Sequence, residues 1–343
     1  MLFRSCGLTL SALENCSNAA DITLQSFKQN FYFGGVTGYN EYFETVSCDN
    51  TGDLSLTVGT PGDKPSSTVL FGGILAYTKK NVSYCNNSGA MNLTGGRSGK
   101  TYYVGGILAQ AGANVYYYGT AAKYMGNSGT ITIDTPATVR VGGIEGSGSG
   151  GRLNYTLNTG DINVTSLGNN CYVGGLRGYC TGQILVSENK ANVSLTTAGA
   201  TAYLSGVTGY QGATQISNTF HTGDLAYKYT GTAVPTVYAG FGCAYLRVRC
   251  TITGTYAGNI TIEGAEGGNV HCHAAVGFAN TTPLEVGSEV TLGNETRPLG
   301  LKAGSMINGV EITAGNFDNK RLLIGGEDGV DYYFASANAI TLE

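Results

Sequence analysis

Tryptophan is absent from the 343 residues, proline occurs only 6 times, and charged residues make up 12% of the chain. So little proline excludes collagen and a proline-rich linker, although glycine is abundant at 54 residues. The formal net charge of −4 gives no basic footprint, so we expect no nucleic-acid partner. No apolar run approaches the ~20 residues of a membrane-spanning helix, so we expect no transmembrane segment in this chain.

The abundant residues are glycine, threonine, asparagine and tyrosine, which favour strands and turns and are typical of β-rich extracellular proteins. The nine cysteines are an odd number and contain no CxxC pair, so they do not establish the compartment. The first residues do not resemble a signal peptide. We therefore expect a signal or anchor upstream of a chain that begins in the middle of a repeat.

A paired glycine between apolar residues recurs about every 34 residues along the chain. The motif reads FGGV at 33–36, FGGI at 71–74, YVGGI at 103–107, VGGI at 141–144 and YVGGL at 172–176, with looser copies at 204–207 and 239–241. A second motif, Asn-x-Gly or a close variant, trails each first one. The iteration of both motifs in register predicts a repeat architecture.

When the repeats are aligned, some columns hold the same residue type in several repeats, and we expect these residues to stack. One column holds asparagine and then His221 and Tyr256, and an earlier one holds Cys16, Cys48 and Cys85. The asparagine column comprises Asn18, Asn50, Asn87, Asn127, Asn158 and Asn189. Asparagine carries both a donor and an acceptor, so it can bond along such a stack.

These patterns predict an all-β fold, a right-handed parallel β-solenoid of about eight coils of ~34 residues, with about three strands per coil. The paired glycines would let each coil turn a corner. We expect the repeats to fill residues 1–282. Residues 283–343 would form the last irregular coils and a C-terminal cap, with a short helix at 316–326.

The motifs GGVTGY (34–39), GGILAY (72–77), GGLRGY (174–179) and SGVTGY (205–210) resemble the GLUG-type repeat of secreted and surface proteins of bacteria, notably Bacteroidetes. The resemblance covers roughly residues 12–282. It implies export, surface display and an adhesin-like or scaffolding role, and it supplies no catalytic residues. Gln110 and Ser147 stand where other copies have tyrosine.

Tyrosine supplies the candidate binding residues. Tyr102, Tyr103, Tyr116, Tyr117 and Tyr118 lie in runs where alternation forces some rings outward, and exposed tyrosine stacks on sugars or protein partners. The insertion at 114–124 is the largest departure from the repeat, and protruding loops of solenoids are frequent contact sites.

Other polar columns favour structural roles. Asp21, Asp53, Asp161 and Asp224 occupy a turn position, although neighbouring Asp21 and Asp53 could also bind a cation. The three stacked cysteines are interpreted as buried thiols, with their redox state open. His271 and His273 lack an apparent third ligand, so we expect no metal, and His221 substitutes for a stacked asparagine. No cofactor is expected.

The function that we expect is that of a non-enzymatic, secreted or surface-displayed, adhesin-like or scaffold protein. It would bind a glycan or protein partner through a solenoid face and the tyrosine-rich loop. The alternatives are a polysaccharide-active β-helix lyase or hydrolase, which needs an outward cluster of carboxylates with a basic residue, and a segment of a phage or virus fibre.

Overall fold

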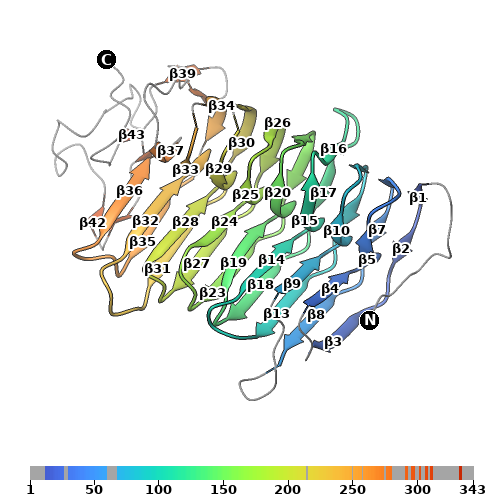
Figure 1. The fold of residues 1–343 in the computed structure, drawn as a ribbon. Helices are drawn as coiled ribbons and strands as arrows, with labels where there is room; N and C mark the ends of the chain where they lie inside the picture. The colour runs from blue at the N-terminus through green and yellow to red at the C-terminus, as the bar shows by residue number, and fades with distance from the viewer. Residues whose placement is uncertain are drawn as a thin grey trace.

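The computed structural model describes residues 12–26, 30–59, 68–213, 215–248, 250–256, 258–273 and 276–279, together with six short strands beyond residue 289. The elements assigned in these residues are strands, with no helix among them. Equivalent strands of successive coils lie side by side, in chain order, along the molecule (Figure 1). The predicted parallel β-solenoid is confirmed, with about seven turns.

Each coil contributes strands to four sheets, which we call D, A, B and C in the order in which the chain passes through them. Strands of one coil pair in parallel with those of the next. The eight strands of sheet D are β4 (Asn30–Gly34), β9 (Thr68–Gly72), β14 (Thr101–Gly105), β19 (Thr138–Gly142), β24 (Cys171–Gly174), β28 (Thr201–Ser205), β32 (Thr236–Gly240) and β36 (Asn269–His273). The eight strands of sheet A are β5 (Thr37–Asn40), β10 (Leu75–Thr78), β15 (Leu108–Ala113), β20 (Glu145–Ser149), β25 (Arg177–Cys180), β29 (Thr208–Gln211), β33 (Cys243–Leu246) and β37 (Val276–Ala279).

Sheet C follows the Asn-x-Gly turn. Its strands are β3 (Ile22–Ser26), β8 (Leu54–Val58), β13 (Met91–Gly95), β18 (Ile131–Thr135), β23 (Ile162–Ser166), β27 (Val193–Thr197), β31 (Leu225–Tyr229), β35 (Ile260–Glu263), β41 (Met306–Ile307) and β42 (Val310–Glu311). Alternation puts Leu54, Met91 and Ile131 inside, in register with one another, so like side chains stack along the core.

Sheet B has two rows of short strands that merge in the later coils. The first row is β1 (Leu13–Glu14), β6 (Thr45–Val46), β11 (Val82–Ser83), β16 (Tyr116–Tyr118) and β21 (Arg152–Asn154), and the second is β2 (Ser17–Asn18), β7 (Asp49–Asn50), β12 (Asn86–Asn87), β17 (Met125–Asn127) and β22 (Thr156–Asn158). The continuous strands are β26 (Gln183–Asn189), β30 (Gln215–His221) and β34 (Thr251–Tyr256).

The expected three strands per coil is therefore wrong. Four or five occur, because the paired glycine splits the first strand between sheets D and A and, in several coils, the strand of sheet B is divided at a left-handed residue. The left-handed residues Val186 and Asn218 lie within the continuous strands β26 and β30. Ser47, Tyr84 and Tyr155 hold this left-handed conformation, at φ of 51°, 55° and 53°. A single residue with positive φ bends the strand locally without a loop.

The asparagine column forms a buried ladder of hydrogen bonds. Asn50 Nδ2 donates to Asn87 Oδ1 at 2.7 Å, and Asn87 Nδ2 donates to Asn127 Oδ1 at 2.7 Å. The same bond joins Asn18 to Asn50, Asn127 to Asn158, Asn158 to Asn189, and Asn189 to His221 Nδ1. Each amide also donates to a carbonyl two residues ahead, as Asn87 does to Gly89 at 3.0 Å. The predicted stack, with His221 as its substitute member, is confirmed.

The paired glycines bend each coil inward until its backbone touches this ladder. A Cβ at Gly35, the second glycine of its pair, would lie 2.8 Å from Cγ of Asn50, and a Cβ at Gly34 would overlap the carbonyl oxygen of Thr37. Any larger residue would force the two strands apart. The corner between sheets D and A is therefore re-entrant, and the outer faces of the two sheets look toward each other.

Beyond residue 289 the described strands are few. β38 (Val290–Leu292) pairs with β39 (Glu295–Arg297), and β40 (Leu301–Lys302) pairs with β43 (Tyr332–Tyr333), both antiparallel, while β41 continues sheet C. The predicted helix at 316–326 lies outside the described residues, and a cap over 283–343 stays a prediction.

Candidate functional site

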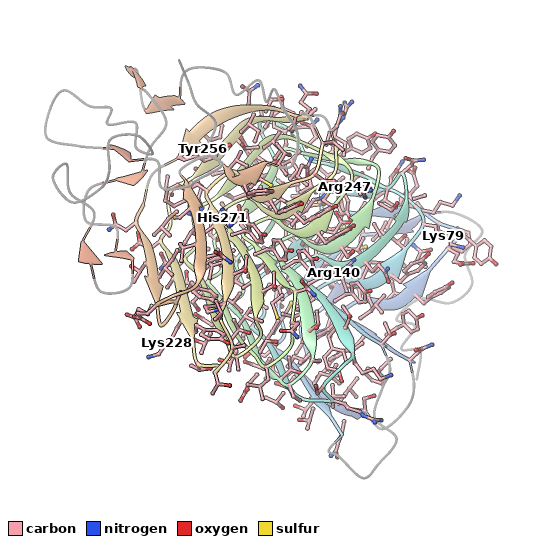
Figure 2. All side chains as sticks on the ribbon, turned by 60° about the vertical axis from the view of Figure 1, so that its left-hand side comes forward. Lys79, Arg140, Lys228, Arg247, Tyr256 and His271 are labelled. Atoms are coloured by element: carbon pink, nitrogen blue, oxygen red, sulfur yellow. The ribbon has the colours of Figure 1, made fainter. Side chains whose placement is uncertain are left out.

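Two columns of outward side chains face each other across the re-entrant corner; we call them the aromatic seam. The column on sheet D consists of Tyr32, Leu70, Tyr103, Arg140, Tyr172, Tyr203, Tyr238 and His271, and the column on sheet A consists of Tyr39, Tyr77, Gln110, Ser147, Tyr179, Tyr210, Tyr245 and Phe278. The seam runs along the stack past Arg140 to His271 (Figure 2).

Rings stack within each column. The ring centroids of Tyr172 and Tyr203 are 4.4 Å apart with an interplanar angle of 11°, and those of Tyr179 and Tyr210 are 4.4 Å apart at 7°. The strand spacing of a parallel sheet, about 4.8 Å, brings in-register rings to this distance. The ring faces therefore cover one another, while the seam rings remain partly exposed.

Rings also meet between the columns, edge to face. Tyr172 and Tyr179 have centroids 5.4 Å apart at 83°, and Tyr203 and Tyr245 have centroids 5.7 Å apart at 87°. Such contacts between outward residues of consecutive strands require the corner to bend inward. Aromatic pairs of these geometries each contribute about 0.5–1.5 kcal/mol beyond burial, so the seam also stabilises the stack.

Several phenols of the seam have a raised pKa and stay protonated at neutral pH. Burial raises the pKa of Tyr172, Tyr203, Tyr210 and Tyr238 above the ordinary value near 10. At the first coil, a hydrogen bond to Glu41 raises the pKa of Tyr39 to about 12. Each of these five phenols can therefore both donate and accept a hydrogen bond.

The structure divides the five predicted tyrosines between the interior and the surface. Tyr102 and Tyr117 are fully buried, so a surface-binding role is not open to them. Tyr103 lies in the seam, while Tyr116 and Tyr118 point outward from sheet B, with Tyr118 38% exposed. Alternation along each strand explains this division.

The insertion interrupts sheet B where other coils have one left-handed residue. Residues 119–124 form a small excursion closed by a bridge between Thr120 and Lys123. The Lys123 ammonium lies 5.7 Å from the ring centroid of Tyr84, and Tyr124 meets Tyr155 edge to face at 6.0 Å. This protruding cluster is separate from the seam, since it lies on a different sheet.

The aspartate column has a structural role. Oδ1 of Asp21 accepts a hydrogen bond from the amide of Asp53 at 2.8 Å, and Oδ1 of Asp53 accepts one from the amide of Ala90 at 2.8 Å. Asp161 and Asp224 bond in the same way to the coils that follow them. These carboxylates connect the turns of adjacent coils, which confirms the turn interpretation.

The cysteine column is buried in the core as predicted. Cys16, Cys48 and Cys85 are at most 8% exposed, and the Cys48 amide donates to Cys85 Sγ at 3.4 Å. Within the described residues no group of three or more His, Cys, Asp or Glu could hold a metal ion. His271 instead stacks on Tyr238 at 5.0 Å as a member of the seam.

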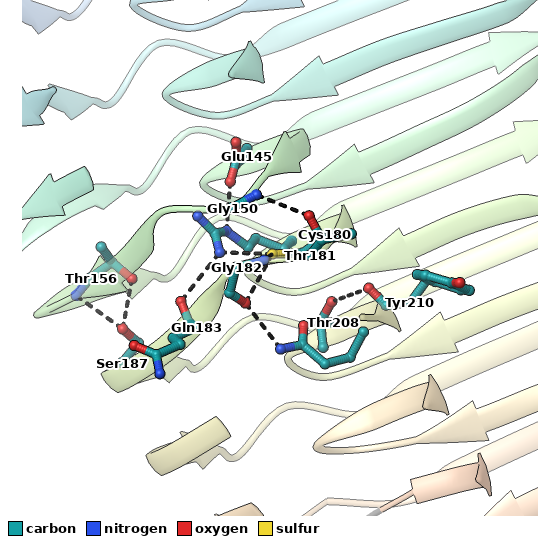
Figure 3. A network of polar contacts seen from close by, with 12 residues as sticks. Glu145, Gly150, Thr156, Cys180, Thr181, Gly182, Gln183, Ser187, Thr208 and Tyr210 are labelled. Carbon is teal, nitrogen blue, oxygen red and sulfur yellow. Dashed lines mark hydrogen bonds and ion pairs between the residues drawn. The ribbon is translucent and has the colours of Figure 1, made fainter. Parts of the chain in front are cut away.

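A buried polar network lies inside the solenoid (Figure 3). Glu145 Oε2 and Arg177 Nε are 2.5 Å apart and both side chains are fully buried. Nη1 of Arg177 donates to Cys180 Sγ at 2.8 Å and to the Gln183 carbonyl at 3.3 Å, while its guanidinium lies 5.4 Å from the Tyr117 ring centroid. This is a carboxylate beside a basic group on adjacent coils, but it points inward.

The electrostatics of this network fit an internal ion pair. Burial raises the pKa of Glu145, and the charge of Arg177 opposes that shift. Burial likewise raises the pKa of the Cys180 thiol to about 11, so the thiol is protonated at neutral pH. Without contact to solvent, the network can join two coils but cannot receive a polymer.

The seam was only partly visible in the sequence. The motif ending in Tyr39, Tyr77, Tyr179 and Tyr210 indicated the column on sheet A, and a tyrosine two residues before the first glycine marks the column on sheet D. The motifs did not predict that the corner between sheets D and A bends inward and brings the two columns together.

Comparison with known protein families, curated proteins and solved structures gave no match. The resemblance to GLUG-type repeats therefore stays a prediction. Among the described residues no helix is both long and apolar enough to cross a membrane.

Proposed function

We propose that this β-solenoid is a non-enzymatic binding protein that holds an extended glycan along the aromatic seam. In keeping with the resemblance to GLUG-type repeats, it would act outside the cell or on its surface, as an adhesin or a scaffold. The observation that carries the proposal is the double column of outward side chains along sheets D and A, in which 12 of the 16 positions hold an aromatic ring. A linear ligand along the seam would meet aromatic rings at most of the coils.

The chemistry of the seam suits a sugar chain. The seam presents ring edges and phenol hydroxyls, because the ring faces cover one another within each column. A glycan carries both hydroxyl groups and C–H surfaces, and tyrosine offers a polar tip on an apolar body. Repeated weak contacts at successive coils sum to useful affinity once the first has formed.

The experiment measures binding of soluble polysaccharides to the purified chain by isothermal titration calorimetry. The seam variant replaces Tyr179, Tyr210 and Tyr245 with Ser, Gln and Gln, residues that the same column already carries at Ser147 and Gln110. We expect affinity to fall by at least about 10-fold, since each lost polar or stacking contact contributes about 1 kcal/mol.

The control variant changes the other tyrosine surface. Replacing Tyr116 with Gln and Tyr118 with Asn uses residue types found at the corresponding positions of the next two coils, since Asn154 lies one coil on and Gln183 two coils on. We expect this variant to bind as the wild type does. Loss of binding in the control but not in the seam variant would move the site to the loop, and shortening of the polysaccharide by the wild type would contradict a non-enzymatic role.

A further inference from the structure

The aromatic seam is interrupted near its middle by polar residues. In the column on sheet D, Arg140 stands between Tyr103 and Tyr172. In the column on sheet A, Gln110 and Ser147 occupy two successive coils between Tyr77 and Tyr179. Three polar side chains thus replace rings within two adjacent coils.

The Arg140 guanidinium reaches across from sheet D into this break. Its central carbon lies 4.0 Å from the ring centroid of Tyr179 and 5.5 Å from those of Tyr103 and Tyr172. Nη1 donates to Ser147 Oγ at 3.2 Å, whereas Nε is buried and has no hydrogen-bond partner. Three rings therefore surround the side chain, and in the described part of the chain its one hydrogen bond is that to Ser147.

No carboxylate in the described part of the chain neutralises Arg140. The four ion pairs found there involve Lys79, Lys190, Lys228 and Arg177. Of the two acidic residues of the same coil, Glu145 points into the interior, and Asp161 lies in the turn before sheet C, where it accepts a hydrogen bond from the amide of Asn192. A partly desolvated guanidinium without a counter-ion favours an anion, and its planar N–H groups suit a carboxylate or sulfate.

We propose that Arg140, with Ser147 and Gln110 beside it, binds an acidic group of the glycan, so that the ligand of the seam is a carboxylate- or sulfate-bearing polysaccharide. This inference rests on the proposed function. The rings would position the sugar backbone, and Arg140 would select its charge and fix its register on the solenoid. Removing this charge would cost about 10- to 100-fold in affinity for the acidic polymer, the usual contribution of a charge-assisted hydrogen bond.

The test compares polymers that share a backbone and differ in charge. Polygalacturonate against its methyl ester examines the carboxylate, and dextran sulfate against dextran examines the sulfate. We expect the wild type to bind at least one acidic polymer about 10-fold or more tightly than its neutral partner. We also expect that preference to shrink as salt is added, because salt screens the ion pair.

Three variants complete the experiment. Arg140→Gln removes the charge, and Arg140→Tyr restores the residue type common in this column, so that stacking is kept. Arg152→Gln removes an equal charge from the outer face of sheet B, where Arg152 bonds to Gln183, and serves as the matched control. Both changes at Arg140 should abolish the preference for the acidic polymer, and the control should keep it. Thermal melting verifies that each variant folds.

The outcomes separate the inference from the proposed function. Equal binding of acidic and neutral polymers, lost only in the seam variant, would overturn the role of Arg140 and leave the glycan site standing. A preference that survives Arg140→Gln and Arg140→Tyr would also overturn it. Binding of none of the polymers would overturn both.

Discussion

Replacing His221 with asparagine should remove a specific part of the pH dependence of stability. The imidazole is fully buried, and Nδ1 lies 2.9 Å from Nδ2 of Asn189, which donates to it. The ring is 5.0 Å from that of Phe241, and Nε2 has no hydrogen-bond partner. Burial lowers the pKa of His221 from its ordinary value near 6.5 to about 3. The folded protein therefore keeps this imidazole neutral.

The sign of the effect follows from proton uptake. Below pH 6.5 the unfolded chain protonates this histidine, whereas the folded chain does so only near pH 3, so acid favours unfolding. The stabilisation is complete above pH 6.5 and is lost as the pH falls. Integrating the difference gives a loss of about 2 kcal/mol between pH 7.5 and pH 5, and about 3 kcal/mol at pH 4.

Urea denaturation at pH 7.5, 6, 5 and 4, followed by circular dichroism, measures the free energy of unfolding of both proteins. His221→Asn continues the amide ladder and does not titrate, so the difference between wild type and variant isolates this group. We expect the difference to shift by about 2 kcal/mol in favour of the variant from pH 7.5 to pH 5. A difference that stays constant with pH would refute the reasoning.

Further predictions concern the interior and use the same urea measurement. Glu145→Gln should lower the free energy of unfolding by about 3–5 kcal/mol because it leaves Arg177 charged and buried. The double variant Glu145→Leu with Arg177→Thr, which uses residue types of the same inner column of sheet A, should lower it little or even raise it. Equal losses of stability in the two variants would contradict this. Asn87→Ala should cost about 2–4 kcal/mol, since three hydrogen bonds of the ladder are lost. Gly73→Ala should reduce stability by more than about 2 kcal/mol, since its Cβ would overlap Asn87, and a melting temperature equal to that of the wild type would refute the packing argument.

The stacking of the coils could be predicted because the repeats can be aligned with one another within this one sequence. Asn50, Asn87 and Asn127 share one column, and a parallel stack is the arrangement that lets identical amides bond in series. The number of strands could not be predicted in the same way. Left-handed residues such as Ser47 and Tyr155 lie where the strand of sheet B is divided in two, and neither is glycine or asparagine, the residue types that usually mark such positions.

The seam could not be predicted from alternation alone. A period of two separates inner from outer residues, but it does not give the angle between consecutive strands. That angle is set by contacts on both sides of the paired glycine, Gly35 against Asn50 and Gly34 against Thr37. The two motifs of the repeat are therefore coupled, because the asparagine occupies the space that a side chain at the second glycine would need.

The two basic residues Arg140 and Arg177 show that the position of a residue in the repeat, and not only its type, decides its role. Both lie in strands of the motif region, but Arg140 stands two residues before its first glycine, in a column of rings, while Arg177 stands two after its second, in a column of Thr37, Leu75 and Leu108. The structure places the first outside and the second inside. Strict alternation does not give this result, because Tyr179, two residues after Arg177 in the same strand, faces outward. An arginine in an inner column requires a buried partner, and Glu145 supplies it from the adjacent coil. An arginine in an outer column without such a carboxylate keeps its charge available, and this difference makes Arg140 the residue on which to test recognition.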